Sequence, residues 1–272
     1  MLSWLIVQEL SHRVVFLLGL PDNQAEQEQL TAEARERGDI VQGSFIDSYR
    51  NLTYKNVMGL LWTTTFCPQV GLVAKTDDDM WLDPWGLVAL APSLPPSTLA
   101  CPLINTTVQR QGKWGVDWKE VGLDSYPTAC SGWLYLLSPN SAALLLQAAQ
   151  QQKTFLWIDD VWVTGILASK VGLGHLSLSR LVTSSPSRLA LVKRLQGPLA
   201  WHWDLVAGPW PGLGTARDLA RRARRCGQEP RCRSNLHTPG YTPGRGEVRG
   251  EEALLGLLRV EERLRQLYKI YA

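Results

Sequence analysis

The sequence predicts an α/β fold with a central, mostly parallel sheet flanked by helices. The first observation behind this prediction is an alternation of short apolar runs with helix-forming stretches over residues 14–89. The second is an apolar content of 45%, which is ordinary for a globular protein that buries a core. The third is a run of three acids, Asp77 to Asp79, directly after an apolar run. Ligands of such sheets lie beyond the carboxyl ends of the strands, where these acids would stand.

The alternation begins with a strand and a helix. Residues 14–18 are a buried-strand candidate, which Gly19 stops. Residues 23–37 are charged and rich in good helix formers, and Gly38 stands where a C-terminal cap belongs. Residues 39–45 can hold a second short strand.

The alternation then leads to the acids. Residues 51–66 suit a second helix, with Leu52, Val57 and Leu60 among its apolar positions. Residues 71–75 are the next strand, ending at the acids, and residues 84–89 form a further helical turn opened by a proline.

The middle of the chain is less regular. Residues 91–127 are rich in Pro, Gly and polar side chains, so we expect loops over the sheet. Residues 130–137 alternate in part and predict a strand, and residues 139–153 predict a helix rich in Ala, Leu and Gln. A second apolar stretch then approaches a pair of acids, Asp159 and Asp160, which open a further predicted helix.

We expect two parts along the chain: residues 1–215 as the main domain, and residues 216–272 as an appendage. The appendage contains an arginine run over 217–233, a flexible Gly- and Pro-rich linker over 239–249 and an amphipathic helix over 251–271. The arginine run is most simply a solvated helix face, with contact to an anionic glycan or a membrane surface as the alternative. The net charge of +3, from 28 basic and 25 acidic residues, does not argue for a nucleic-acid partner.

The two glycosylation sequons favour a secretory compartment. Asn51 and Asn105 each begin an Asn-x-Thr sequon for N-glycosylation. The five cysteines lack zinc spacing and could form two disulfides in that compartment, with one cysteine left over. No apolar run reaches the roughly 18 residues of a membrane span, and the first 20 residues lack the order of a signal peptide, so the chain as written shows no anchor.

The three consecutive carboxylates at 77–79 repel one another, and a divalent cation would neutralise them. Mg²⁺ and Mn²⁺ prefer carboxylate oxygens and leave positions open for substrate phosphates. This chemistry suits an enzyme whose leaving group is a nucleoside diphosphate. For an isolated acidic run, a solvated turn after a strand is the alternative.

Five blocks of sequence resemble one family in its order and at about its spacing. These blocks are residues 39–55 (DIVQGSFIDSYRNLTYK), Trp62 with Cys67-Pro68, Lys75 to Asp79, Tyr126-Pro127 with Cys130-Ser131-Gly132, and Asp159-Asp160-Val161. The chain is therefore similar, over residues 14 to about 210, to the β-1,3-glycosyltransferases of glycosyltransferase family 31. The resemblance implies a GT-A type fold, a UDP-sugar donor, Mn²⁺ and inversion to a β-1,3 linkage. It also implies a glycan acceptor on a glycoprotein or glycolipid and a type II membrane protein of the Golgi.

The resemblance also assigns residues. It implies that Asp79 binds the metal, together with His202, which stands 42 residues after Asp160, or with the alternative His175. Asp77, Asp78 and Lys75 are expected at the nucleotide, Asp160 as the general base, and Trp133, Tyr135 and Asp159 at the acceptor. Core packing is the alternative for the aromatic side chains, and a helix N-cap is the alternative for Asp160.

The chain also departs from the family pattern. Asp159 replaces the usual Glu, and Trp133 stands where Gly is common. Only residues 1–13 precede the first predicted strand, without the family's arginine-bearing motif, so we expect a shortened N-terminus. We therefore expect an inverting hexosyltransferase that uses UDP-galactose or, as the runner-up, UDP-N-acetylglucosamine. The alternative is a non-catalytic relative that binds glycans or assists folding.

Overall fold

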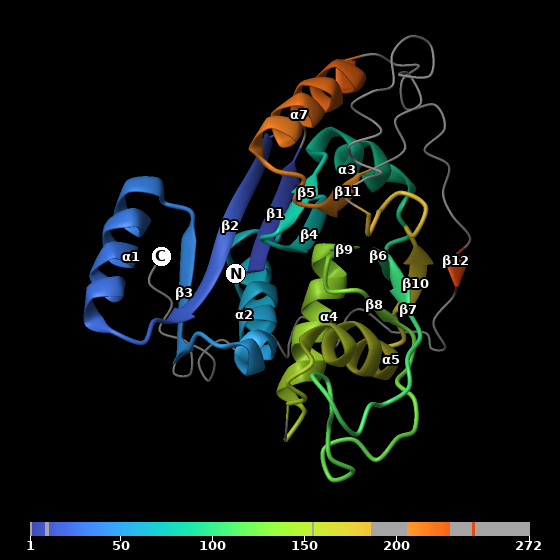
Figure 1. The fold of residues 1–272 in the computed structure, drawn as a ribbon. Helices are drawn as coiled ribbons and strands as arrows, with labels where there is room; N and C mark the ends of the chain where they lie inside the picture. Colours follow the sequence, from blue (N-terminus) through green and yellow to red (C-terminus); the bar gives the residue numbers. More distant parts are fainter. Residues whose placement is uncertain (1, 9–10, 154, 186–205, 229–240, 243–272) are drawn as a thin grey trace.

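A computed structural model describes residues 2–8, 11–153, 155–185, 206–228 and 241–242. Its centre is an eight-stranded sheet (Figure 1). The strands follow one another across this sheet in the order β12 (Tyr241–Thr242), β10 (Gly174–Ser177), β6 (Thr98–Cys101), β9 (Leu134–Leu137), β4 (Leu72–Asp77), β1 (Leu2–Gln8), β2 (Ser11–Leu20) and β3 (Ile40–Ile46).

Two short strand pairs and several helices complete the described structure. The pairs are β5 (Met80–Leu82) with β11 (Ala207–Pro209), and β7 (Leu103–Ile104) with β8 (Ala129–Cys130). The α-helices are α1 (Gln24–Arg37), α2 (Leu52–Phe66), α3 (Pro84–Leu90), α4 (Pro139–Gln150), α5 (Ala168–Lys170) and α7 (Leu213–Gln228). Two 3₁₀ turns, η1 (Tyr49–Asn51) and η2 (Ala91–Ser93), and a π-helix, η3 (Val161–Leu167), join them.

The strand directions confirm the predicted α/β class with a mostly parallel sheet. β2 pairs with β3 and β6 pairs with β10 in parallel. β1 and β9 run antiparallel to both of their neighbours, so β3, β2, β4, β6 and β10 all point the same way. Five of the eight strands therefore share one direction, with β1 and β9 inserted between them.

Alternate side chains of the strands supply two cores, because successive residues of a strand point to opposite faces of the sheet. Val73 and Tyr135 belong to the core that contains α2, α4 and η3. Their neighbours Ala74 and Leu136 belong to the core that contains α3. The molecule thus has helices on both faces of the sheet, with α1 beyond the β3 edge (Figure 1).

Four predicted helices are confirmed. Asn23 caps α1 by accepting a hydrogen bond from the Glu26 amide at 2.9 Å. Gly38 ends α1 in the left-handed region, with φ of 66°, and donates its amide to Ala34. The predicted helices at 51–66, 84–89 and 139–153 are observed as α2, α3 and α4.

Three expectations about strands were wrong or incomplete. The segment 91–127 is not all loop, because it contributes β6 to the middle of the sheet and β7 to a small pair. The predicted strand over 130–137 is two short strands, β8 and β9, in different sheets. β1 was not predicted at all, and it lies between β2 and β4. β6 was not predicted because its short sequence lies next to prolines, which indicate a loop.

The start of the arginine run forms helix α7, which packs against α3. The buried residues of α7 include Ala216, Leu219 and Ala223. The predicted linker over 239–249, apart from β12, and the predicted helix over 251–271 lie outside the described residues. Within the described ranges, no helix is both long enough and apolar enough to cross a membrane.

Candidate active site

The acid run lies where the sequence places it, at the carboxyl end of a sheet strand. Asp77 is the last residue of β4, and Asp78 and Asp79 form the turn into β5. Asp77 is half-buried, whereas Asp78 and Asp79 are exposed. Asp77 and Asp79 line a pocket of about 590 Å³ together with Asp159 and Asp160. The fold therefore brings the two acid blocks, about 80 residues apart in sequence, to one cavity.

Lys75 places a positive charge behind these acids. Its side chain is 1% exposed, and its Nζ donates to Asp77 Oδ1 at 2.8 Å and to the Gly132 carbonyl at 2.7 Å. The same nitrogen lies 4.0 Å from Asp159 Oδ2. Burial alone would lower the pKa of Lys75, but the two nearby carboxylates outweigh it and raise the pKa. Lys75 thus stays charged and ties both acid blocks to the loop that carries Gly132.

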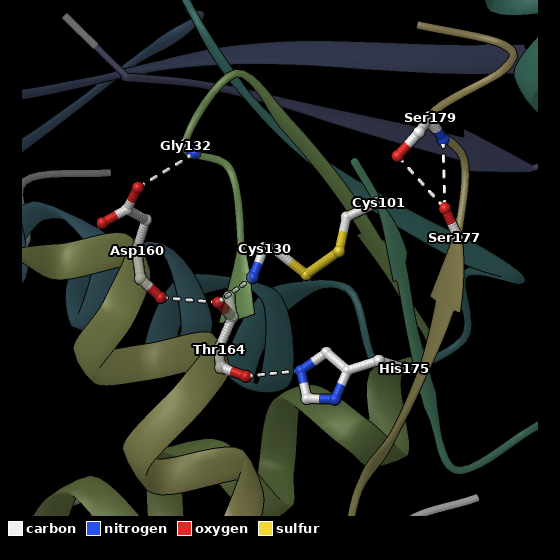
Figure 2. The surroundings of a disulfide bond; sticks show 8 residues. All are labelled: Cys101, Cys130, Gly132, Asp160, Thr164, His175, Ser177 and Ser179. Atoms are coloured by element: carbon white, nitrogen blue, oxygen red, sulfur yellow. Dashed lines mark hydrogen bonds between the residues drawn. A yellow bond between two sulfur atoms is a disulfide. The ribbon is translucent and has the colours of Figure 1, made fainter. Parts of the chain in front are cut away.

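Asp160 stands at the start of η3 and is held by two backbone amides. Its Oδ1 accepts from the Val161 amide at 2.7 Å and its Oδ2 from the Gly132 amide at 3.1 Å, as Figure 2 shows for Gly132. Burial raises the pKa of Asp160 to about 6, helped by the charge of Asp159 and opposed by the Val161 amide and Lys75. The carboxylate is therefore ionised at neutral pH and more basic than an exposed aspartate.

A disulfide and a threonine fix the loop opposite Asp160 (Figure 2). Cys101 of β6 is bonded to Cys130 of β8. The Cys130 amide donates to Thr164 Oγ1 at 2.8 Å, and that hydroxyl donates to the Asp160 carbonyl at 2.5 Å. The strand that precedes Gly132 is thus attached both to the central sheet and to the first turn of η3. Of the other three cysteines, Cys67 is a free thiol, whereas the side chain of Cys226 and all of Cys232 lie outside what the structure describes.

A chain of two buried hydrogen bonds holds the Asp159 carboxylate in place. The Asn56 amide donates to Asp159 Oδ2 at 3.0 Å, and the Tyr135 hydroxyl donates to Asn56 Oδ1 at 2.6 Å. Burial raises the pKa of Tyr135 well above its ordinary value, so the phenol stays protonated and able to donate. Sequence reasoning missed Asn56, although a polar residue in the apolar part of a predicted helix is a usable signal of a buried contact.

One predicted acceptor residue is corrected by this arrangement. Tyr135 is 0% exposed and does not line the pocket, so its ring cannot contact an acceptor; it packs in the core and supports Asp159 instead. Trp133 and Asp159 do line the pocket. The Trp133 carbonyl accepts from Thr76 Oγ1 at 2.8 Å, which attaches the start of β9 to β4 beside the acids.

The two histidine candidates differ. His202 lies outside the described residues. His175 is buried on β10, and its Nε2 donates to the Thr164 carbonyl at 2.7 Å (Figure 2). Burial lowers the pKa of His175, and this residue does not line the pocket, so it is not placed as a metal ligand beside Asp79.

The acid pocket offers oxygen ligands of the kind a hard divalent cation prefers. Within the part of the chain that the structure describes, no group of three His, Cys, Asp or Glu side chains could hold a metal ion together. Asp77 and Asp79 nevertheless fit the type of site in which one or two carboxylates bind the metal and substrate phosphates complete its coordination.

The two sequons have different surroundings. Asn51 is the last residue of η1, and its amide donates to the Ile46 carbonyl at 2.8 Å. Thr53 is buried, with its hydroxyl donating to Leu156. Asn105 is exposed, and its Oδ1 accepts from the Thr128 hydroxyl at 2.8 Å. The second sequon is therefore the more accessible one in the folded protein.

Comparisons with known proteins point to one family. The family model described as galactosyltransferase matches residues 3–179. β-1,3-Galactosyltransferase 5 of Mus musculus is 33% identical over 222 residues, which cover 78% of this chain and 71% of the relative. The enzyme of the same name from Gorilla gorilla gorilla is 35% identical over 197 residues, covering 70% and 65%. Lactosylceramide 1,3-N-acetyl-β-D-glucosaminyltransferase A of Xenopus laevis is 32% identical over 174 residues, covering 59% and 45%. The matched segment thus takes in less than two thirds of the length of the last two relatives.

Proposed function

The chain belongs to the galactosyltransferase family, and from this membership we propose that it is an inverting β-1,3-glycosyltransferase. The reaction moves a hexose, galactose or an N-acetylhexosamine, from a UDP-sugar to a hydroxyl of a glycan acceptor on a glycoprotein or glycolipid. The two kinds of relative, named for galactosyl and N-acetylglucosaminyl transfer, support both donors.

The observation that carries the proposal is the position of Asp160. Its carboxylate lines the same pocket as Asp77 and Asp79, and burial with the charge of Asp159 raises its pKa to about 6. A sugar hydroxyl is a poor nucleophile, so an inverting transfer needs a base that takes the proton as the oxygen attacks the anomeric carbon. A base works best with a pKa near the working pH, and Asp160 is closer to that condition than an ordinary aspartate.

The N-cap alternative for Asp160 is compatible with this role. Oδ1 accepts from the Val161 amide, as a cap does, and Oδ2 accepts from the Gly132 amide. A carboxylate has about four lone-pair sites, so two amides leave room for a substrate hydroxyl. The amides hold the side chain in one orientation, which a general base in the pocket requires.

Asp79 would hold a divalent cation beside the donor, with Mn²⁺ as the expected ion, and Asp77 would lie at the nucleotide. When bound, the cation would supply neutralising charge for the departing diphosphate. Lys75 already bonds one oxygen of Asp77, so Asp79, exposed in the turn, offers more free coordination. We assign Asp78 and Lys75 to the surroundings of the nucleotide.

The proposal that His202 completes the metal site has indirect support. The described chain resumes at Val206, and β11 pairs with β5 directly after the acid run. The Trp210 amide donates to the Asp79 carbonyl at 2.7 Å. The chain soon after His202 therefore lies beside Asp79.

We propose that the protein works in the lumen of the secretory pathway, as Golgi glycosyltransferases do. The Cys101–Cys130 disulfide supports this, because disulfides persist in oxidising compartments. The exposed Asn105 sequon is consistent with the same compartment.

The test of the proposed function is UDP release from a panel of UDP-sugars with Mn²⁺ and glycan acceptors, comparing wild type with Asp79→Ala. We expect release with UDP-galactose or UDP-N-acetylglucosamine in the wild type and none above background in the variant, with unchanged circular dichroism. Wild-type protein that binds glycans without releasing UDP from any donor would instead identify the non-catalytic relative. Normal turnover in Asp79→Ala would remove Asp79 from the metal site.

A further inference from the structure

The segment 105–126 is an ordered loop that closes on itself at its base. Thr107 and Ser125 form an antiparallel bridge. The Val108 amide donates to Asp124 at 2.8 Å, and the Tyr126 amide donates to Thr106 at 3.1 Å. Loops of this kind, with ends close together and their own packed side chains, frequently carry function.

The interior of this loop is braced by an arginine and by apolar side chains. The Arg110 guanidinium donates to the carbonyls of Val116 and Val121 at 3.3 and 3.0 Å. It also stacks 3.5 Å from the ring centroid of Trp118. Val116 and Val121 are buried in the core that contains α2, α4 and η3. The loop is therefore held in one shape before any ligand arrives, which lowers the entropy cost of binding.

Trp114 of the loop joins Tyr49 of η1 to form an aromatic wall of the pocket. The Trp114 Nε1 donates to the Tyr49 hydroxyl at 3.1 Å. The Lys113 Nζ lies 4.9 Å from the centroid of the Tyr49 ring and 5.3 Å from that of the Trp114 ring. Tyr49 also contacts the ring of Trp157, with centroids 6.1 Å apart. All four residues line the pocket that contains Asp160.

This wall keeps a large aromatic surface available to a ligand. Tyr49 is 50% exposed and Trp114 is 46% exposed, although both are large amphipathic side chains fixed by contacts. In the lining of the same pocket, Trp157 and Tyr126 each bury a polar atom, Nε1 and the hydroxyl, with no hydrogen-bond partner among the described residues. Leaving such an atom unpaired costs about 1–3 kcal/mol in general. A ligand hydroxyl that reaches these atoms after a small rotation of the rings would recover this cost.

The lining of the pocket thus combines two kinds of chemistry. The carboxylates and Lys75 suit a metal and a diphosphate. The aromatic rings have polar tips. Sugars combine apolar C–H faces with hydroxyl groups, so rings with a polar tip are matched to them, as such side chains are to other surfaces that are partly apolar and partly wet.

We propose that Tyr49 and Trp114 form the acceptor-binding wall and determine which glycan the protein accepts. This inference rests on the proposed function for its reaction. Trp114 lies outside the five sequence blocks, and Tyr49 lies in the first of them without an assigned role. The inference divides the pocket into a donor end at Asp77 and Asp79 and an acceptor end at the 105–126 loop, with Asp160 lining the same cavity.

The experiment compares Trp114→Ala with Trp118→Ala. The two tryptophans lie four residues apart on the same loop and are both exposed, but Trp118 does not line the pocket. The probes are methyl β-galactoside, methyl β-N-acetylglucosaminide and lactose. We expect the acceptor KM to rise about fivefold to tenfold in Trp114→Ala, in line with the loss of one aromatic contact. The donor KM should stay within about twofold. Both constants of Trp118→Ala should resemble the wild type, because the hydrogen bonds of Arg110 and the buried Val116 and Val121 still hold the loop.

Direct binding of the same sugars, followed by saturation-transfer NMR, gives a readout that needs no turnover. The inference is supported if the wild type and Trp118→Ala bind the sugars and Trp114→Ala does not. If this pattern is seen but the wild type transfers no sugar, only the proposed function is wrong. Tyr49→Leu changes the other residue of the wall, which lies in η1 and not in the loop. It should behave like Trp114→Ala, and this would show that the effect of Trp114→Ala does not come from a misfolded loop. Equal acceptor constants in the two tryptophan variants, a selective loss of donor affinity, or no sugar binding by the wild type would overturn the inference.

Discussion

The Gly132 amide donates to Asp160 Oδ2 at 3.1 Å, while the Gly132 carbonyl accepts from Lys75 Nζ at 2.7 Å. One peptide loop therefore contacts both the base that we propose and the cation behind the donor acids. A Cβ added at Gly132 would lie at 3.5 Å from that same oxygen, so the approach is close but not strained. The Gly132 peptide therefore joins the two acid blocks through hydrogen bonds to Lys75 and Asp160.

We predict that transfer loses activity on the acid side with an apparent pKa near 6. The pKa of Asp160 is about 6, raised mainly by burial and then by the charge of Asp159. The base must be ionised to accept a proton, so the rate should fall about tenfold per pH unit below this pKa. The measurement is kcat/KM against pH at saturating Mn²⁺.

Asp159→Asn extends this pH test to the cause of the shift. Removing the neighbouring negative charge should lower the pKa of Asp160 and move the acid limb of the profile to lower pH. The matched control is Asp124→Asn, an exposed aspartate outside the pocket, whose profile should not move. An acid limb that moves to higher pH in Asp159→Asn would contradict the electrostatic explanation.

We predict that Lys75→Met destabilises the fold by roughly 2–3 kcal/mol. Removing one partner of a buried ion pair leaves the other charge uncompensated, and Lys75 is the cation for Asp77 and Asp159. We expect a smaller loss than for a fully buried ion pair, because the Asp77 side chain is 32% exposed and water screens part of its charge. Urea unfolding measures the change.

The control for this prediction is Lys119→Met, which alters an exposed lysine and should shift stability by less than about 0.5 kcal/mol. Equal stability of Lys75→Met and wild type would show that the buried cation is not needed to hold the acid blocks in place.

We predict that breaking the Cys101–Cys130 disulfide lowers both stability and transfer. The bond closes a loop with a sequence separation of 29, for which the chain-entropy model gives about 3–4 kcal/mol. It also fixes the strand that leads to Gly132, so Cys130→Ser should loosen the backbone around Asp160. Thermal unfolding and the transfer rate are compared with Cys67→Ser, which changes a free thiol. Full activity of Cys130→Ser at a temperature where the variant is folded would show that the site does not need the disulfide.

The sequence predicts those parts of the fold that local signals encode. The caps of α1 at Asn23 and Gly38, and the position of the acids after β4, follow from residue types within a few positions of each other. β1 and β6 were not predicted, because their places in the sheet depend on partners far along the chain, such as Leu5 opposite Ala74. Propensity alone does not carry that information.

The candidate site divides in the same way. The resemblance identified Asp79 and Asp160, and the pocket brings them together. The supports of the site were missed, because they join residues that are far apart in sequence: Asn56 to Asp159 over 103 positions and Trp114 to Tyr49 over 65. Tyr135 was assigned to the acceptor for its aromatic ring, but β9 places that ring in the core. The division of the chain at residue 215 stays a prediction.

The central claim is that Asp160 activates the acceptor while Asp77 to Asp79 serve the donor. Asp160→Asn tests it most directly, because an amide of the same size cannot take a proton at neutral pH. Its oxygen can accept from only one of the Val161 and Gly132 amides, so the variant should lose about 1 kcal/mol of stability yet remain folded. Calorimetry of UDP binding with Mn²⁺ is run beside a transfer assay. We predict near-normal UDP affinity with transfer reduced by roughly 10²–10⁴-fold. Wild-type transfer, or a loss of UDP binding as complete as that of Asp79→Ala, would contradict the account.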